Sequence, residues 1–249
     1  MTRSDRRWLT IMAVGLVVVS AILYGIHYAI FRDSHHIFIY LMGDIAFVPL
    51  EVLIVALILD RLISLREKRS LAHKLNMVIG AFFSELGTPL LVELLPAMDA
   101  APQIRERLHL TALWKKDDFY RASRFALTLD SDVDLQRIDL ARLASYLQER
   151  RQFLLRLLEN PNLLEHQRFT DLLWAIFHLE EELEARTSLA DLSPADEAHL
   201  QLDVRRVYTQ LAAAWVLYVG HLKQDYPYLF SLVLRVHPFQ ESPSPVVTG

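Results

Sequence analysis

Two acidic residues, Asp44 and Glu51, lie inside an apolar stretch that carries no other charge. They are seven residues apart, so on a helix their side chains point within about 20° of each other and lie about 10 Å apart along the axis. An acid in the middle of a membrane span costs roughly 2.5–3.5 kcal/mol, and it therefore needs water, a partner or a bound proton. The chemistry that this pair predicts is the handling of cations or protons.

The neighbours of the two acids extend this candidate ion or proton pathway. Tyr40, Val48 and Val55 follow the same helical spacing as the acids, so they share one face of the helix. Gly43 and Pro49 flank the acids and are candidates for a kink or gate, because a proline inside a helix cannot donate a hydrogen bond to the preceding turn. The stripe therefore combines polar groups with a point of helix weakness.

An earlier apolar stretch offers intramembrane partners for one of the two acids. In an antiparallel hairpin Asp44 lies level with Tyr24, and His27 lies about one helical turn further outward. Ser20 is on the same ridge, since these three residues of the first stretch have i, i+4, i+7 spacing. We expect a contact of Asp44 with Tyr24 or His27 within one chain.

The deeper acid has no such partner in its own hairpin. Glu51 falls level with Leu16 and Val17, which are apolar. We therefore expect Glu51 to meet another subunit, water, an ion or a proton, and this mismatch predicts a homo-oligomer. A ridge of small residues suited to close helix packing lies on another side of the first stretch: Ala21, Gly25 and Ala29.

The elements that carry these residues are two membrane spans, at about residues 8–31 and 37–59. Each exceeds the roughly 20 residues that a helix needs to cross a bilayer. The first apolar run is too long for a cleaved signal peptide and has no cleavage site, so it is read as a retained anchor. We expect a multi-pass protein of the cell (inner) membrane.

Basic residues set the expected orientation. Positive charges precede the first span and follow the second, which places both termini in the cytoplasm. The cluster after the second span is also a candidate for contacts with anionic lipid headgroups. Its members are Arg61, Arg66, Lys68, Arg69 and Lys74.

Beyond the membrane every periodic segment is helical, so the predicted fold class is all-α. The second span should continue as a long helix to about Glu85–Gly87, where Gly87 suits a C-terminal cap. The expected organisation is a cytoplasmic tail at 1–7, a transmembrane hairpin at 8–63, a cytoplasmic helical domain at 64–239 and a disordered tail at 240–249.

Capping signals place the later helices. We expect helices at about 103–129, with a break near Lys115–Asp118, and at about 133–159, stopped by Asn160-Pro161. Asn162 with Glu165 forms a capping box for a helix that runs to about Arg186. Ser193-Pro194 opens the next helix. A shorter apolar helix follows Pro227.

Composition excludes several classes of function. The chain of 249 residues has no cysteine, which removes disulfides, thiolate metal sites and cysteine nucleophiles. A net charge of −4 without a basic stripe gives no nucleic-acid signal. Only seven glycines are present, and no nucleophile, base and orienting group can be assembled from spacing. We therefore expect neither an enzyme nor a cofactor.

Two short motifs invite a metal. Glu106 and His109 form an E-x-x-H, and Asp196 and His199 a D-x-x-H, of the sort that helical bundles use in pairs. The further carboxylates are not identifiable, and capping explains Asp196, so no metal is predicted. On a separate predicted helix, His166, His178 and the acidic run 180–182 lie together. Here His178 and Glu182 are close enough to touch, but a solvated acidic face is the simpler interpretation.

Three functions remain. The favoured one is a channel-like homo-oligomer larger than a dimer, embedded in lipid, whose acidic face handles cations or protons. The first alternative is a membrane-anchored interaction or signalling module that docks a cytoplasmic protein. The second is a cytoplasmic-side enzyme, for which no constellation is found. A helix face that merely fixes hairpin register also accounts for the two acids, since burial can keep a carboxyl group neutral.

Overall fold

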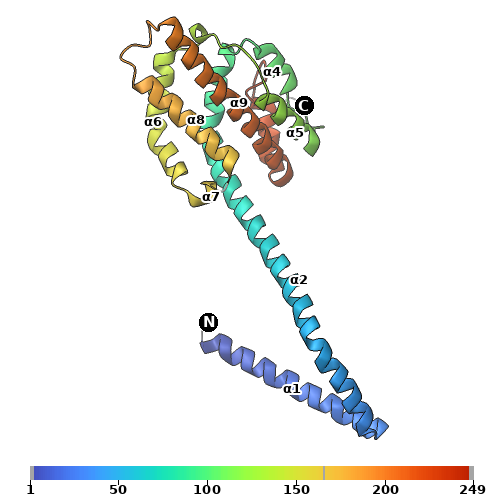
Figure 1. Ribbon diagram of the computed structural model, residues 1–249. Helices are drawn as coiled ribbons and strands as arrows, with labels where there is room; N and C mark the ends of the chain where they lie inside the picture. Colours follow the sequence, from blue (N-terminus) through green and yellow to red (C-terminus); the bar gives the residue numbers. More distant parts are fainter. Residues whose placement is uncertain (1–2, 165, 247–249) are drawn as a thin grey trace. The chain divides into compact units, whose positions relative to one another are not determined.

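The computed structural model describes residues 3–164 and 166–246, and it describes side chains in these ranges except at 3–7, 9, 36, 67–74, 162 and 164. Every regular element in these ranges is a helix, and one isolated antiparallel bridge joins Met98 to Val133. The all-α prediction is confirmed. By its internal contacts the chain forms two units, Met1–Lys68 and Arg69–Gly249 (Figure 1).

The first unit, here the apolar unit, contains α1 (Arg3–Phe31) and the part of α2 (Ser34–Phe82) up to Lys68. Arg32 ends α1 in the left-handed conformation, with a φ of 50°, and its N–H donates to the Tyr28 carbonyl at 2.8 Å. Helix α2 continues through Pro49 without interruption. The windows Thr10–Phe31 and Ile37–Arg66 are long and apolar enough to cross a membrane, and none of their residues is buried.

A third window, Leu75–Ala97, is also long and apolar enough to span a membrane, but half of it is buried within the second unit. It joins the end of α2 to the π-helical turn Phe83–Gly87, to α3 (Thr88–Leu94) and to the 3-10 turn Leu95–Ala97. Phe82, Leu86 and Leu90 are completely buried. The core of the second unit therefore accounts for the apolar character of this window.

Gly87 is not the C-terminal cap that the sequence predicts. Its φ of −67° and ψ of −44° are helical, and the chain passes directly from the π turn into α3. A Cβ at this position would lie 2.6 Å from Phe83 Cδ1 and 2.7 Å from Phe82 Cε1. The glycine is thus explained by two aromatic rings that need its space, because no left-handed turn exists here.

The second unit, here the bundle, is built around α9 (Pro194–Asp225). This helix packs against α3, α5 (Lys116–Leu127), α8 (Gln167–Glu184) and α10 (Pro227–Val236). Helix α6 (Leu140–Leu158) packs on α8 (Figure 1). The remaining helices of the bundle are α4 (Ala101–Arg107) and α7 (Pro161–Leu164), with a 3-10 turn at Leu135–Arg137.

Some helix starts were predictable and others were not. Ser193 caps α9 by accepting from the Asp196 N–H at 3.3 Å, and α10 follows Tyr226 as expected. The segment predicted to be helical at 103–129, with a break near Lys115–Asp118, forms two helices, but the connection between them is longer and begins earlier, at residues 108–115. Leu108 and Leu110 are buried in that connection, so the apolar spacing continues through a segment that is not helical.

The helix predicted from 133 begins later. Val133 is buried and bridged to Met98, and α6 starts after Asp139, whose carboxylate accepts from the Arg142 N–H at 2.9 Å.

The capping box of Asn162 and Glu165 lies outside the described residues. Within the tail expected to be disordered, the described residues 240–246 include Ser244, whose N–H donates to the Arg235 carbonyl at 3.1 Å.

Candidate functional sites

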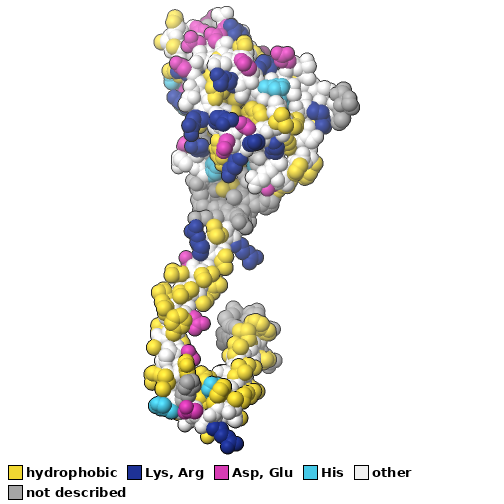
Figure 2. Space-filling model, turned by 90° about the vertical axis from the view of Figure 1, so that its right-hand side faces the viewer, with side chains coloured by type: hydrophobic (Ala, Val, Ile, Leu, Met, Phe, Trp, Pro, Cys, Tyr) yellow, Lys and Arg dark blue, Asp and Glu magenta, His cyan; other side chains and the backbone are white. Residues whose placement is uncertain are grey.

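The two acids of α2 lie on the surface of the apolar unit. Asp44 and Glu51 are both exposed, and neither has a hydrogen bond or ion pair within the described residues. Figure 2 shows acidic side chains that interrupt the largely hydrophobic surface of this unit. The predicted contact of Asp44 with Tyr24 or His27 is therefore not formed within the described part of a single chain.

The other predicted pathway and partner residues are surface groups as well. Those on α2 are exposed: Tyr40, Val48 and Val55. On α1, Ser20 and Tyr24 are exposed, whereas His27 is half-buried with its ring 4.7 Å from that of Phe31. A Cβ at Gly43 would meet nothing within 4 Å, and Pro49 lies inside α2. This face of the apolar unit is thus open.

The basic cluster is described only in part. Arg61 and Arg66 are exposed on α2, as a contact with lipid headgroups requires. The side chains of Lys68, Arg69 and Lys74 lie outside the described residues.

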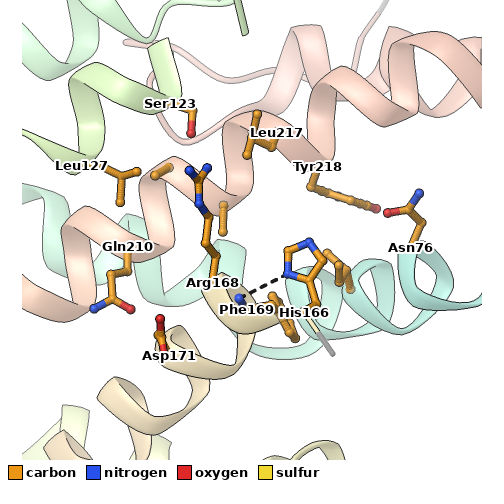
Figure 3. Close-up of a pocket in the computed structure, with 13 residues that line it drawn as sticks. Asn76, Ser123, Leu127, His166, Arg168, Phe169, Asp171, Gln210, Leu217 and Tyr218 are labelled. Atoms are coloured by element: carbon orange, nitrogen blue, oxygen red, sulfur yellow. Dashed lines mark hydrogen bonds between the residues drawn. The ribbon is translucent and has the colours of Figure 1, made fainter. Parts of the chain in front are cut away.

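The bundle contains a cavity of about 330 Å³ that sequence analysis missed (Figure 3). Its lining comes from four different helices and from the segment before α8, which is why no sequence spacing revealed it. The lining residues are Asn76, Ile79, Ser123, Leu127, His166, Arg168, Phe169, Asp171, Gln210, Ala213, Ala214, Leu217 and Tyr218.

Polar groups at the cavity wall are held in defined positions. Asn76 Nδ2 lies 3.1 Å from His221 Nδ1, and His166 Nδ1 accepts from the Phe169 N–H at 3.3 Å (Figure 3). Gln210 Oε1 is buried and has no hydrogen bond within the described ranges. A mainly apolar cavity of this size with a few placed polar groups has the character of a small-molecule site.

Tyr218 forms one wall of the cavity. Its ring stacks on Phe83 with 5.0 Å between centroids, and burial raises the pKa of its hydroxyl. A Cβ at Gly80 would lie 3.3 Å from that hydroxyl oxygen. The glycine on α2 therefore lets the tyrosine ring pack close to the helix backbone.

The two motifs weighed for metal binding do not form a common site. Glu106 and His109 are exposed, and the His109 ring lies 5.4 Å from that of His237. The Asp196 carboxylate accepts from Arg186, with Oδ1 2.6 Å from Nη2. This guanidinium holds the pKa of Asp196 below its ordinary value. The Asp196 carboxylate is thus ion-paired, while its backbone N–H donates to the cap residue Ser193.

The architecture defines an all-helical protein in which two long apolar helical segments precede a helical bundle. The sequence comparisons agree with this division. Residues 71–235 match the family model described as Uncharacterized protein MJ1433, C-terminal helical domain, and residues 3–63 match the model described as MJ1433, N-terminal helical domain. The chain belongs to the MJ1433 family.

One relative extends the match over nearly the whole chain. Uncharacterized protein MJ1433 of Methanocaldococcus jannaschii is 41% identical over 236 residues, which is 95% of each chain. No solved structure matches.

Proposed function

We propose that the protein is an integral membrane homo-oligomer in which the acids of α2 handle cations or protons. The observation that carries this proposal is Glu51, an exposed carboxylate that has no partner among the described residues, on a helix segment apolar enough to span a bilayer. Facing lipid, such a group is costly, and intramembrane acids mark ion or proton paths. Contacts between subunits or a water-filled lumen would relieve this cost.

A closed ring larger than a dimer would use the whole acidic face. Rings of acidic side chains are one way in which cation channels select their ions. With Asp44 and Glu51 about two turns apart, each subunit would supply two successive acidic levels. Tyr40, Val48 and Val55 would line the same wall, and Gly43 with Pro49 would be the point at which the wall bends.

The proposed setting is the cell membrane, with both termini in the cytoplasm. Arg61 and Arg66 are exposed just beyond the apolar part of α2, where the positive-inside rule expects cytoplasmic charge. The same side chains would contact anionic lipid headgroups.

The test is flux through liposomes that contain the full-length protein. Glu51→Gln keeps the shape of the side chain and removes its charge, so proton or cation flux should fall at least about tenfold, the effect expected when a charge-stabilising group of about 1.4 kcal/mol is lost. Asp60→Asn is the matched control, since Asp60 lies nine residues on and about 180° around the helix. Its flux should equal that of the wild type.

Two results would overturn the proposal. One is wild-type liposomes that stay impermeable to protons, Na⁺, K⁺, Mg²⁺ and Ca²⁺ across membrane potential and pH. The other is a monomer or dimer by native mass spectrometry from mild detergent. Equal loss of flux in Glu51→Gln and Asp60→Asn would also count against a specific role of the acidic face.

The cavity of the bundle favours a second candidate, a membrane-anchored module that binds a ligand or signals to a cytoplasmic protein. Here the apolar unit would act only as an anchor, so an unrelated two-span anchor should preserve function. Ala214→Phe would fill the cavity and abolish binding of a fluorescent probe of apolar sites such as anilinonaphthalene sulfonate. Ala185→Phe, at an exposed position outside the cavity, is the control.

A further inference from the structure

Four side chains capable of binding a metal ion converge between α8 and α9. His178 and Glu182 are one turn apart on α8, and His199 and Asp203 are one turn apart on α9. Each helix thus offers an imidazole and a carboxylate from the same face, the i, i+4 spacing that lets two side chains reach one point. The site lies in the bundle, apart from both the acids of α2 and the cavity.

The distances match those between ligands of a single ion. Asp203 Oδ2 lies 3.3 Å from His199 Nε2 and 3.6 Å from His178 Nε2. Glu182 lies 3.6 Å from His199 Nε2 through Oε2 and 3.8 Å from His178 Nε2 through Oε1. Atoms about 2.1 Å from a tetrahedral ion are about 3.4 Å apart, so these four imidazole–carboxylate separations are close to the value for two ligands of one ion. His178, Glu182 and His199 also each offer a ligand atom within 4.8 Å of the other two.

Asp203 supplies an independent observation. Its side chain is 2% exposed, yet Oδ2 has no hydrogen bond within the described residues. A buried carboxylate oxygen without a hydrogen bond is costly, because the group has lost its water and gained no donor in return. This oxygen faces both imidazole nitrogens, where an ion would satisfy it.

Two arginines fix the carboxylates from behind. Arg206 Nη1 lies 2.6 Å from Asp203 Oδ1, which leaves Oδ2 for the centre of the cluster. Arg186 Nη1 lies 2.7 Å from Glu182 Oε2, so this guanidinium holds the Glu182 carboxylate in place. Such outer partners orient metal ligands in known sites.

The local charge also suits a cation. Three acids around the cluster, Glu182, Asp196 and Asp203, are paired with the guanidinium groups of Arg186 and Arg206. Three carboxylates against two guanidinium groups leave one negative charge in surplus. Neutral imidazoles add none, so a divalent ion meets a site of complementary sign.

We propose that His178, Glu182, His199 and Asp203 bind one divalent transition-metal ion, with Zn²⁺ the ion that fits best. Two imidazole nitrogens and two carboxylate oxygens in a tetrahedral set suit Zn²⁺, whereas Mg²⁺ and Ca²⁺ prefer six or more oxygen ligands. With four protein ligands the site is closed, so the ion joins α8 to α9 and has a structural role. This inference is independent of ion passage through the membrane.

The experiment uses full-length protein in detergent, prepared without a polyhistidine tag and treated with a chelator. Titration with Zn²⁺ alone, monitored by calorimetry, should show one binding site per chain. Bound Zn²⁺ should also raise the Tm of the protein. Co²⁺ in the same site should give the strong visible absorption of a tetrahedral complex. His199→Gln should weaken Zn²⁺ binding at least about tenfold, since even loss of an outer partner costs about ten- to a hundredfold.

His109→Gln is the matched control, because it removes an exposed imidazole elsewhere in the bundle, and it should bind Zn²⁺ like the wild type. His178 and His199 are 44% and 50% exposed, so neither substitution removes core packing. If circular dichroism shows that one variant misfolds, the other supplies the same test from the opposite helix. The proposal would be overturned if a folded His178→Gln or His199→Gln protein bound Zn²⁺ with the affinity of the wild type. It would also be overturned if the wild type did not bind about one Zn²⁺ per chain.

Discussion

Two glutamates show how differently the bundle and the apolar unit are built. Glu180 in α8 is 1% exposed and is ion-paired to Arg151 in α6, which also contacts Glu181 and Glu184. Glu51 in α2 is exposed and has no partner within the described part of its chain. The bundle supplies a charged partner from within, whereas the apolar unit leaves its acid to be satisfied by something else.

The glycines repeat this difference. A Cβ at Gly15, Gly25 or Gly43 of the apolar unit would meet nothing within 4 Å, whereas at Gly87 and Gly220 of the bundle it would lie within 3.0 Å of an aromatic side chain. Close packing of this kind is typical of a folded protein interior. Among the described residues the bundle is therefore closely packed at these glycines, whereas the apolar unit leaves its glycines in open space.

The largest expected effect breaks the internal pairing of the bundle. Arg151→Ala would leave Glu180 buried without its cation, and removing one member of a buried pair costs about 3–5 kcal/mol. Burial already raises the pKa of Glu180, and Arg151 opposes that rise. Denaturant unfolding of the detergent-solubilised protein, followed by near-ultraviolet circular dichroism, should show the loss of stability.

A double substitution distinguishes charge burial from lost packing. Arg151 also lies over the Phe177 ring, with its guanidinium carbon 4.6 Å from the centroid. Arg151→Met with Glu180→Leu removes both charges and keeps apolar volume, so most of the stability should return. If the double variant is as unstable as Arg151→Ala, the unpaired charge is not the cause.

The helical class of both units could be predicted from sequence because hydrophobic periodicity reports which residues one face buries. Periodicity does not report whether the chain is helical between two buried residues. Leu108 and Leu110 keep the spacing in a connection, and Val133 keeps it beside a β-bridge. Capping at Ser193 was predictable because a cap involves residues only three apart.

The candidate sites divide along the same line. The acidic face of α2 could be predicted because Asp44 and Glu51 lie on one helix. The contact of His178 with Glu182 could also be predicted, but its meaning depends on Asp203, which α9 brings into place through packing on α8. The sequence does contain the signal of two i, i+4 pairs of histidine and acid on successive helices. The register between those helices cannot be deduced from the sequence.

The second prediction concerns pH and the interior of the bundle. His237 is 2% exposed, and burial, aided by nearby His109, lowers its pKa to about 4. The unfolded chain takes up this proton near pH 6.5 and the folded chain near pH 4, so stability is lost as pH falls through that window. The loss should reach about 3 kcal/mol.

The control for this titration is His237→Phe, which keeps a ring among Trp215 and Phe239 but binds no proton. The free energy of unfolding of this variant should vary less between pH 6.5 and pH 4. An unchanged pH dependence would assign the effect to other groups.

The third prediction uses one substitution in both units. Gly87→Ala places a methyl group against Phe82 and Phe83, and overpacking of this kind costs about 1–3 kcal/mol. Gly43→Ala meets open space and should stabilise α2 by about 0.5–1 kcal/mol, since glycine weakens helices. Unfolding of both variants in the same detergent checks the sign. If both substitutions destabilised the protein equally, Gly43 would be closely packed, and the difference between the two units would not hold.

The smallest effect on the bundle is expected from Gly25→Ile in α1. This substitution should change the free energy of unfolding of the bundle by less than about 0.5 kcal/mol. Outside its own helix backbone, no described residue lies within 4 Å of a Cβ at this position, so in the proposed homo-oligomer the new side chain would displace lipid or a second subunit. If the small ridge of Ala21, Gly25 and Ala29 joins helices of different subunits, a branched side chain there should dissociate the oligomer.

Gly15→Ile is the matched control for this substitution. It introduces the same side chain into the same helix, also into open space, about 80° around the axis from Gly25. Native mass spectrometry should then show smaller assemblies for Gly25→Ile alone. If both variants keep the wild-type assembly, the ridge faces lipid, and the subunits must meet through another face, of which the acidic stripe of α2 is the one with a physical need for a partner.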